Sequence, residues 1–243
     1  MEDELIKKLE LYVKNYDMND ENIKRKYYHS IRVMKFAKNI AESLKIEAHN
    51  MELAIVAGIL HDYGRFEQWK NYKTYSDVDS IDHGDLAVDL LFNQNEITNF
   101  YNNNSAYKQL YYAIKFHNKL EIPNDLDDRY LLLCNIVRDA DKLDIFNLLI
   151  ENKNLFSEDS CEITDNVKKD FFEEKCINYK EIKNKSDKII LLLAVFYDLK
   201  FNYSLDYIKE NRIIDKLYDN VENKEKYKIY FEQIYKYFNK KIQ

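Results

Sequence analysis

The chain has very little glycine and proline, because its 243 residues include only 3 Gly and 1 Pro. Both residue types punctuate sheets and turns, so their scarcity favours long helices joined by short polar connections. Lys, Glu, Leu and Ile are abundant, which agrees with helices. The hydrophobic share of 46% is enough for a sizeable core. The composition therefore predicts an all-α protein.

Cysteine and long apolar runs are also scarce. The 3 cysteines, Cys134, Cys161 and Cys176, are widely spaced and form no CxxC pair, so neither disulfides nor a cysteine zinc site is expected. The longest apolar run, residues 189–197, is far shorter than a membrane span. Residues 1–10 lack the basic-then-apolar pattern of a signal peptide. These absences predict a cytoplasmic protein with no membrane partner.

The chain also has fewer basic than acidic residues, with 37 Lys and Arg against 43 Asp and Glu. The net charge of −6 argues against broad binding to a nucleic-acid backbone, so nucleic acid is not an expected partner. The sequence leaves open whether the protein forms a homo-oligomer.

Apolar positions recur at helical spacing along most of the chain. Helices are predicted at residues 4–16, 21–45, 50–61, 81–91, 105–117 and 125–151, and then at 165–179, 187–202, 205–218 and 223–240. Residues 70–82 show no convincing period and are expected to form a loop. With no flexible linker in sight, we expect one domain over residues 1–160 and a helical C-terminal extension over residues 161–243, packed on it in the same globule.

Histidines form the most informative pattern in the chain. Four of the 5 fall in one ordered series, with His29 first, then the doublet His61-Asp62, then His83 and His117. Neutral imidazoles and carboxylates are the groups that bind divalent transition metals. The series therefore predicts a metal site assembled from several helices.

Two apolar runs end in ionisable side chains. Residues 53–62 end at the histidine-aspartate doublet, and residues 131–141 end with Asp139 and Asp141. Burying such groups costs several kcal/mol unless they are paired or bind a metal. The aspartates of the second run are therefore candidates for the same site, and Asp139 is a candidate for orienting a ligating imidazole.

Five segments carry these residues, in the order 28–34, 58–67, 82–90, 113–119 and 136–145. Together they resemble the HD superfamily of metal-dependent phosphohydrolases. The resemblance covers roughly residues 21–150 and does not explain the remainder. It implies that residues 1–160 form an HD-domain helical bundle with metal-dependent hydrolase activity.

The resemblance also implies a set of metal ligands. His29, His61, Asp62 and Asp141 correspond to the direct ligands, and Asp141 is preferred because the last ligand of the family commonly lies in an Ala-Asp-basic-Leu context, here residues 140–143. Members with two metals add histidines between the doublet and the last aspartate. His83 and His117 occupy such places, so they are candidate ligands of a second ion. Ligation rich in histidine favours Mn, Fe, Co, Ni or Zn, and Mg is compatible.

The predicted reaction is hydrolysis of a phosphate ester of a nucleotide or a similar small metabolite by a metal-activated water. One ion fits phosphomonoesterase or pyrophosphohydrolase activity, and two ions add phosphodiesterase activity. The candidate catalytic residues are Asp62, Arg65, His83 and His117. The candidate contacts to substrate phosphate are Arg32, Arg65, Lys115 and Lys142. The sequence does not choose between His83, His117 and a metal-bound water as the general acid.

Each of these residues also has an ordinary structural interpretation. Histidines can lie on a helix face, Asp141 can form a helical ion pair, and the acidic residues 77–82 are typical of a solvated loop. For the whole protein, the alternatives are a non-catalytic regulator that binds a nucleotide or a partner, and, less favoured, a di-iron oxygenase. The regulator would be favoured by loss of a ligand, and none is lost here.

Overall fold

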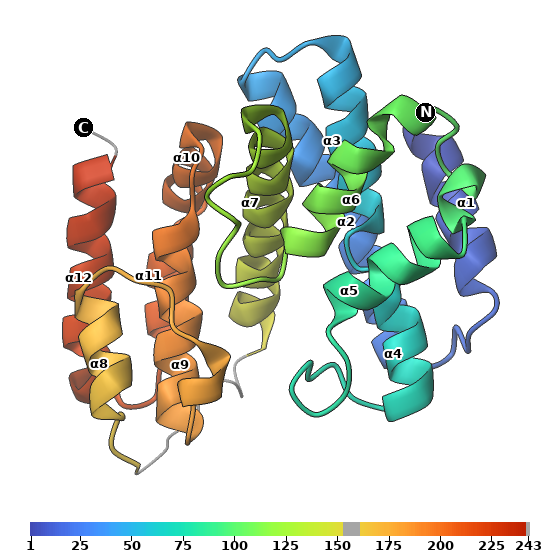
Figure 1. Ribbon diagram of the computed structural model, residues 1–243. Coiled ribbons are helices and arrows are strands. Elements are labelled where there is room, and N and C mark those ends of the chain that lie inside the picture. Colours follow the sequence, from blue (N-terminus) through green and yellow to red (C-terminus); the bar gives the residue numbers. More distant parts are fainter. Residues whose placement is uncertain (153–160, 242–243) are drawn as a thin grey trace. The chain divides into compact units, whose positions relative to one another are not determined.

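The computed structural model describes residues 1–152 and 161–241. Within these ranges the chain is helical and contains no strand, which confirms the predicted all-α class (Figure 1). It divides into two compact units, residues 1–144 and residues 145–243, and each is described by itself. The domain boundary expected after residue 160 lies outside the described residues.

The first unit is built from seven α-helices and short connecting turns. They are α1 (Glu2–Val13), α2 (Glu21–Ser43), α3 (Ala48–Leu60), α4 (Gly64–Tyr72), α5 (His83–Val88), α6 (Tyr107–Phe116) and the part of α7 (Asp128–Glu151) that precedes residue 145. A π-helical turn over Asp89–Asn93 follows α5, and two 3-10 turns, Glu96–Asn99 and Asn104–Ala106, lead into α6.

Helices α2 and α3 form the centre of this unit. Helix α2 begins where the Asp20 side chain accepts a hydrogen bond from the backbone N–H of Asn22, as a typical N-cap does. Helix α3 is buried along its second half. At Gly58, an added Cβ would lie only 3.0 Å from Met34 Cα and from Ala37 Cβ of α2. This close approach places the C-terminal end of α3 against the middle of α2.

Helix α4 starts immediately after the histidine-aspartate doublet and ends with Lys73 in a left-handed conformation. The loop predicted from residue 70 therefore begins only at residue 73, and the prediction was wrong for residues 70–72, which are helical. Trp69, in the last turn of α4, packs on Tyr75 of the following loop, with ring centroids 4.9 Å apart.

We expect Gly64→Ala to destabilise the protein by about 1–3 kcal/mol, the usual cost of overpacking. A Cβ at Gly64 would lie 2.5 Å from the carbonyl oxygen of His83 and 2.8 Å from the backbone nitrogen of Ala87, and backbone atoms cannot rotate away. Urea unfolding measures the change, with the exposed Asn102→Ala as the control. Equal stability of Gly64→Ala and the native chain would show that α5 can shift freely.

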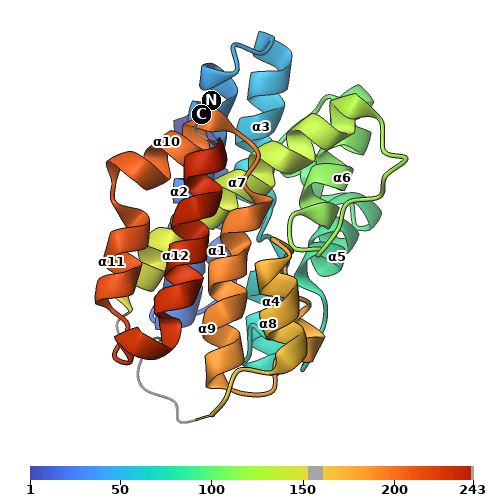
Figure 2. The ribbon, with the colours of Figure 1, turned by 90° about the vertical axis from the view of Figure 1, so that its left-hand side faces the viewer.

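The second unit contains α8 (Asp165–Phe172), α9 (Lys185–Ala194), α10 (Asn202–Glu210), α11 (Ile213–Asp219) and α12 (Lys224–Lys241) after the end of α7. Helices α11, α12, α9 and α8 lie side by side in this order (Figure 2). Stacked rings fill part of its core, as between Phe146 and Phe196, whose centroids are 4.1 Å apart.

Three helices predicted in this unit differ from the structure. The helix predicted over residues 165–179 ends at Phe172, and the one predicted over residues 187–202 ends at Ala194 and is followed by a 3-10 turn over Val195–Asp198. The expected helix over residues 205–218 is two helices, α10 and α11, because Arg212 adopts a left-handed conformation with φ of 52°. No disulfide joins Cys134, Cys161 and Cys176, all of which lie in the described part of the chain. Across the described part of the chain, no helix combines the length and apolar character that a membrane crossing needs.

Candidate metal centre

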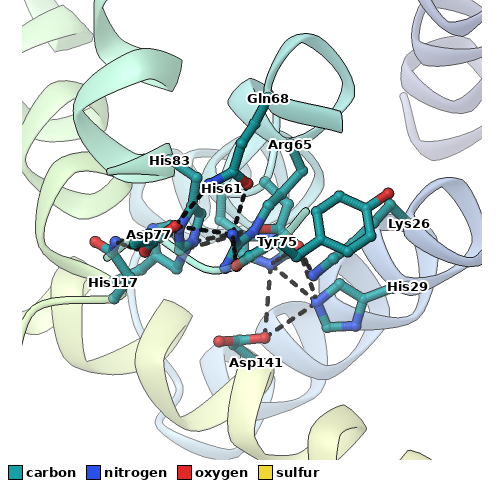
Figure 3. Close-up of polar contacts among 12 residues, drawn as sticks. Lys26, His29, His61, Arg65, Gln68, Tyr75, Asp77, His83, His117 and Asp141 are labelled. Carbon is teal, nitrogen blue, oxygen red and sulfur yellow. Dashed lines mark hydrogen bonds and ion pairs between the residues drawn. The ribbon is translucent and has the colours of Figure 1, made fainter. Parts of the chain in front are cut away.

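Six side chains of the first unit, contributed by five of its helical segments, converge on one centre (Figure 3). They are His29 from α2, His61 and Asp62 from the end of α3, His83 from the start of α5, His117 just after α6, and Asp141 from α7. The structure thus brings together all the residues that the sequence nominated as metal ligands. Their roles toward an ion stay predictions.

The carboxylate of Asp62 lies between two groups of donors. Its Oδ2 is 3.3 Å from His29 Nε2 and 3.5 Å from His61 Nε2. Its Oδ1 is 3.4 Å from His83 Nε2 and 3.8 Å from His117 Nε2. One carboxylate therefore faces two groups of imidazole donors through its two oxygens.

Asp141 completes the first of these groups. Its Oδ1 is 3.1 Å from His29 Nε2 and 3.6 Å from His61 Nε2. We call His29, His61, Asp141 and Oδ2 of Asp62 the first donor group. His83, His117 and Oδ1 of Asp62 form the second donor group.

Backbone carbonyls fix the orientation of one imidazole in each donor group. His61 Nδ1 donates to the carbonyl of Gly58 at 2.8 Å, and His117 Nδ1 donates to the carbonyl of Ile114 at 2.7 Å. Because a carbonyl oxygen only accepts hydrogen bonds, Nδ1 must carry the proton in both rings. When the rings are neutral, Nε2 then presents its lone pair to the centre.

The other histidine of each group is held by a carboxylate, and an arginine holds that carboxylate. In the first group His29 Nδ1 lies 2.6 Å from Asp144, which also accepts bonds from Arg32 Nε at 2.6 Å and Nη2 at 3.0 Å. In the second group His83 Nδ1 lies 2.7 Å from Asp77, whose other oxygen accepts from Arg65 at 2.9 Å. Such outer contacts fix the ring and make it a better ligand.

Sequence reasoning missed both carboxylates. It nominated Asp139 for orienting an imidazole, whereas the carboxylate that contacts His29 is Asp144, one helical turn after Asp141. The acidic residues 77–82 were expected to form a solvated loop. This was wrong for Asp77, which points into the centre and also accepts bonds from Gln68 and Asn118.

The electrostatics of the second donor group favour neutral imidazoles. Burial lowers the pKa of His83, and burial with the neighbouring imidazoles lowers the pKa of His117 well below its usual value. Their Nε2 atoms are nevertheless only 2.9 Å apart. Two lone pairs this close repel unless a cation lies near both, so this donor set fits a divalent transition metal. Four imidazoles and two carboxylates in all provide enough ligands for one or two ions.

The carboxylate at the centre stays ionised. Burial raises the pKa of Asp62, but the charges of Lys26 and His61 outweigh this effect and hold the pKa well below its usual value. Asp62 is only 2% exposed, so the negative charge is retained inside the protein. A buried carboxylate of this kind needs cations beside it.

The protonation of His29 differs from that of His83 and His117. Burial and the charge of Lys26 lower the pKa of His29. Hydrogen bonds to Asp141, Asp144 and Asp62 outweigh both effects and raise this pKa to about 10. Without a metal, the ring of His29 is therefore protonated at neutral pH.

We expect the metal-free protein to lose stability as the pH rises from 6.5, the ordinary pKa of a histidine, to about 10, the pKa of His29 in the fold. The protonated ring stabilises the fold fully below the lower value, and this contribution is lost as the pH passes the upper one. Urea unfolding of chelator-treated protein across this range measures the effect. Stability that stays constant or rises would contradict it.

Metal binding is expected to show the opposite pH dependence. An ion at His29 must displace the proton from Nε2, so affinity should rise with pH and about one proton per chain should be released. Calorimetric titrations in two buffers of different ionisation enthalpy count that proton. Equal heats in both buffers would contradict the assignment of His29 as a ligand.

The four nominated phosphate contacts lie in different surroundings. Arg65 belongs to the centre, with Nε 3.4 Å from Asp62 Oδ1. Arg32 reaches it only through Asp144 and is 41% exposed. Lys115 pairs with Asp85 at 2.8 Å, and Lys142 donates to the carbonyl of Arg138 at 3.2 Å. Their contacts with substrate stay predictions.

A further lysine was missed by sequence reasoning. The ammonium of Lys26 lies 2.6 Å from Oδ2 of Asp62. Lys26 precedes His29 by three residues, one helical turn, which is the relation that could have indicated it. In a chain with 37 Lys and Arg, that spacing alone is a weak indication.

Comparison with known families agrees with this geometry. Residues 27–145 match the family model described as the HD domain. The chain belongs to the HD superfamily of metal-dependent phosphohydrolases. HD domains bind divalent metals, and most members of the family are metal-dependent hydrolases. Searches of curated proteins and of solved structures gave no significant match.

Proposed function

We propose that the protein hydrolyses a phosphate ester of a nucleotide or a similar small metabolite, using one or two divalent transition ions. The observation that supports this most directly is the Asp62 carboxylate, whose two oxygens each face a pair of imidazole Nε2 atoms. Four imidazoles favour Mn, Fe, Co, Ni or Zn over Mg.

The first donor group would hold one ion and the second donor group the other. When bound, the metal lowers the pKa of a water molecule and supplies hydroxide near neutral pH. The carbonyls of Gly58 and Ile114 and the carboxylates of Asp144 and Asp77 keep the four imidazoles oriented, so little reorganisation is needed during the reaction.

A substrate would reach the centre where its side chains are partly exposed. The four imidazoles and Asp62 are almost fully buried. At the centre, the side chain of Asp141 is 16% exposed, that of Lys26 17% and that of Asp77 27%. A substrate would therefore approach beside these side chains, where Lys26 and Arg65 carry positive charge. The two cations there can bind phosphate oxygens, and the surrounding protein excludes bulk water.

A phosphate-release screen tests the proposal. Purified protein loaded with Mn²⁺ is offered nucleoside mono-, di- and triphosphates, cyclic dinucleotides and simple phosphomonoesters. We expect release of phosphate or pyrophosphate, or cleavage of a phosphodiester, from at least one class, and no reaction after chelation. Metal-loaded protein that binds nucleotides and turns none of them over would favour the non-catalytic regulator instead.

A further inference from the structure

The ammonium of Lys26 lies where it competes with a metal. It contacts Oδ2 of Asp62 at 2.6 Å, and the same oxygen faces the Nε2 atoms of His29 and His61 (Figure 3). Lys26 thus supplies one positive charge to the oxygen that would bind an ion in the first donor group. A divalent ion bound there would repel the ammonium at short range in a weakly solvated site.

Lys26 shares the aromatic ring of Tyr75 with two other cations. Lys26 Nζ lies 5.4 Å from the centroid of the Tyr75 ring. The guanidinium carbons of Arg25 and Arg65 lie 5.7 Å and 5.6 Å from the same centroid. The ring is held in place, because its hydroxyl donates to the carbonyl of Asn22 at 2.9 Å. An ammonium displaced from Asp62 would remain near this ring, which Arg25 and Arg65 also approach. Three cations around one ring create a positive potential that favours an anion.

We propose that Lys26 exchanges partners when metal binds: it pairs with Asp62 in the metal-free protein, and in the metal-loaded protein it binds an oxyanion of the phosphorylated substrate. This proposal rests on the proposed function of the same site. It assigns Lys26 as the residue through which metal binding prepares the site for substrate. By linkage, the metal and a phosphate anion then bind with positive coupling.

Metal affinity provides the first test. Chelator-treated full-length protein is titrated with Mn²⁺ by calorimetry, comparing the native chain with Lys26→Met, Lys26→Arg and Lys24→Met. Methionine keeps most of the aliphatic stem and removes the charge. Lys24 lies on the same helix, and its Nζ is 3.4 Å from Glu21 at the surface, so it serves as the control.

We expect Lys26→Met to bind Mn²⁺ about tenfold more tightly than the native chain, as loss of a close competing charge implies. Lys26→Arg should stay near the native affinity, because it keeps the charge, and Lys24→Met should match the native chain. Equal or weaker binding by Lys26→Met would overturn the proposal. Circular dichroism of each variant excludes a loss of helix as the cause.

Phosphate affinity provides the second test. Inorganic phosphate is titrated into each Mn²⁺-loaded protein. We expect Lys26→Met to bind phosphate roughly tenfold more weakly, since it lacks one charged hydrogen bond. Unchanged phosphate affinity would overturn the exchange, as would a native Mn²⁺-loaded protein that binds no phosphate. Failure of the native chain to bind Mn²⁺ at all would instead contradict the proposed function itself.

Discussion

Asp62→Asn is expected to remove metal from both donor groups and to lower phosphohydrolase activity by roughly a thousandfold or more. Asp62 is the one residue whose oxygens face His29 and His61 on one side and His83 and His117 on the other. An amide cannot supply two anionic oxygens. Loss of several kcal/mol of charge stabilisation by metal corresponds to about three factors of ten in rate.

Metal analysis of the purified variant and the phosphate-release assay measure this effect. The control is Asp165→Asn on α8, which removes the same charge from a side chain that is 98% exposed. The control should keep its metal and its activity. If Asp62→Asn retained one full equivalent of ion with native activity, the shared role of Asp62 would be wrong and a single-ion site would have to be considered.

Asp144→Asn is expected to weaken metal binding in the first donor group by about 10- to 100-fold, the usual effect of losing a carboxylate behind a ligating histidine. Asp144 is fully buried and accepts bonds from both His29 and Arg32. An asparagine in its place presents an amide NH₂ to one of these donors. We also expect a loss of about 3 kcal/mol in unfolding free energy, at the low end for a broken buried pair because Arg32 is partly exposed.

Asp77→Asn is the matched comparison, because Asp77 plays the same part for His83 in the second donor group. In titrations with Mn²⁺, we therefore expect Asp144→Asn to weaken binding in the first donor group and Asp77→Asn to weaken binding in the second donor group. The intact group would retain about one ion per chain in each case. Identical titration curves for both variants would show that the two carboxylates do not act on separate ions. Urea unfolding of chelator-treated protein measures the stability change.

Much of this centre could be predicted because most of its candidate ligands belong to a residue type that is rare in this chain. Histidine is rare here, with 5 in the chain, so an ordered series of four is informative. The helices followed from apolar periodicity. Neither argument reaches Lys26 or Asp144. Each lies one turn from a nominated ligand, but lysine and aspartate are common in this chain, and the angle at which a helix presents them depends on tertiary packing.

Loop residues were the hardest to assign. Asp77 has no periodic neighbours and lies in an acidic stretch that resembles any solvated loop. Its role depends on Gln68 and Arg65 of α4, whose side chains reach across to it. Arg212 likewise gave no indication that it would interrupt a helix, because a left-handed arginine is not favoured by local propensity.

Arg65 connects the loop that follows α4 to the Asp62 carboxylate at the centre. Its guanidinium donates to the Tyr75 carbonyl and to Asp77 in the loop, and it lies beside Asp62. Lifting this loop would therefore free the imidazole of His83 to rotate. The position of this loop and the orientation of the His83 imidazole therefore depend on the same arginine, so a change in one would change the other.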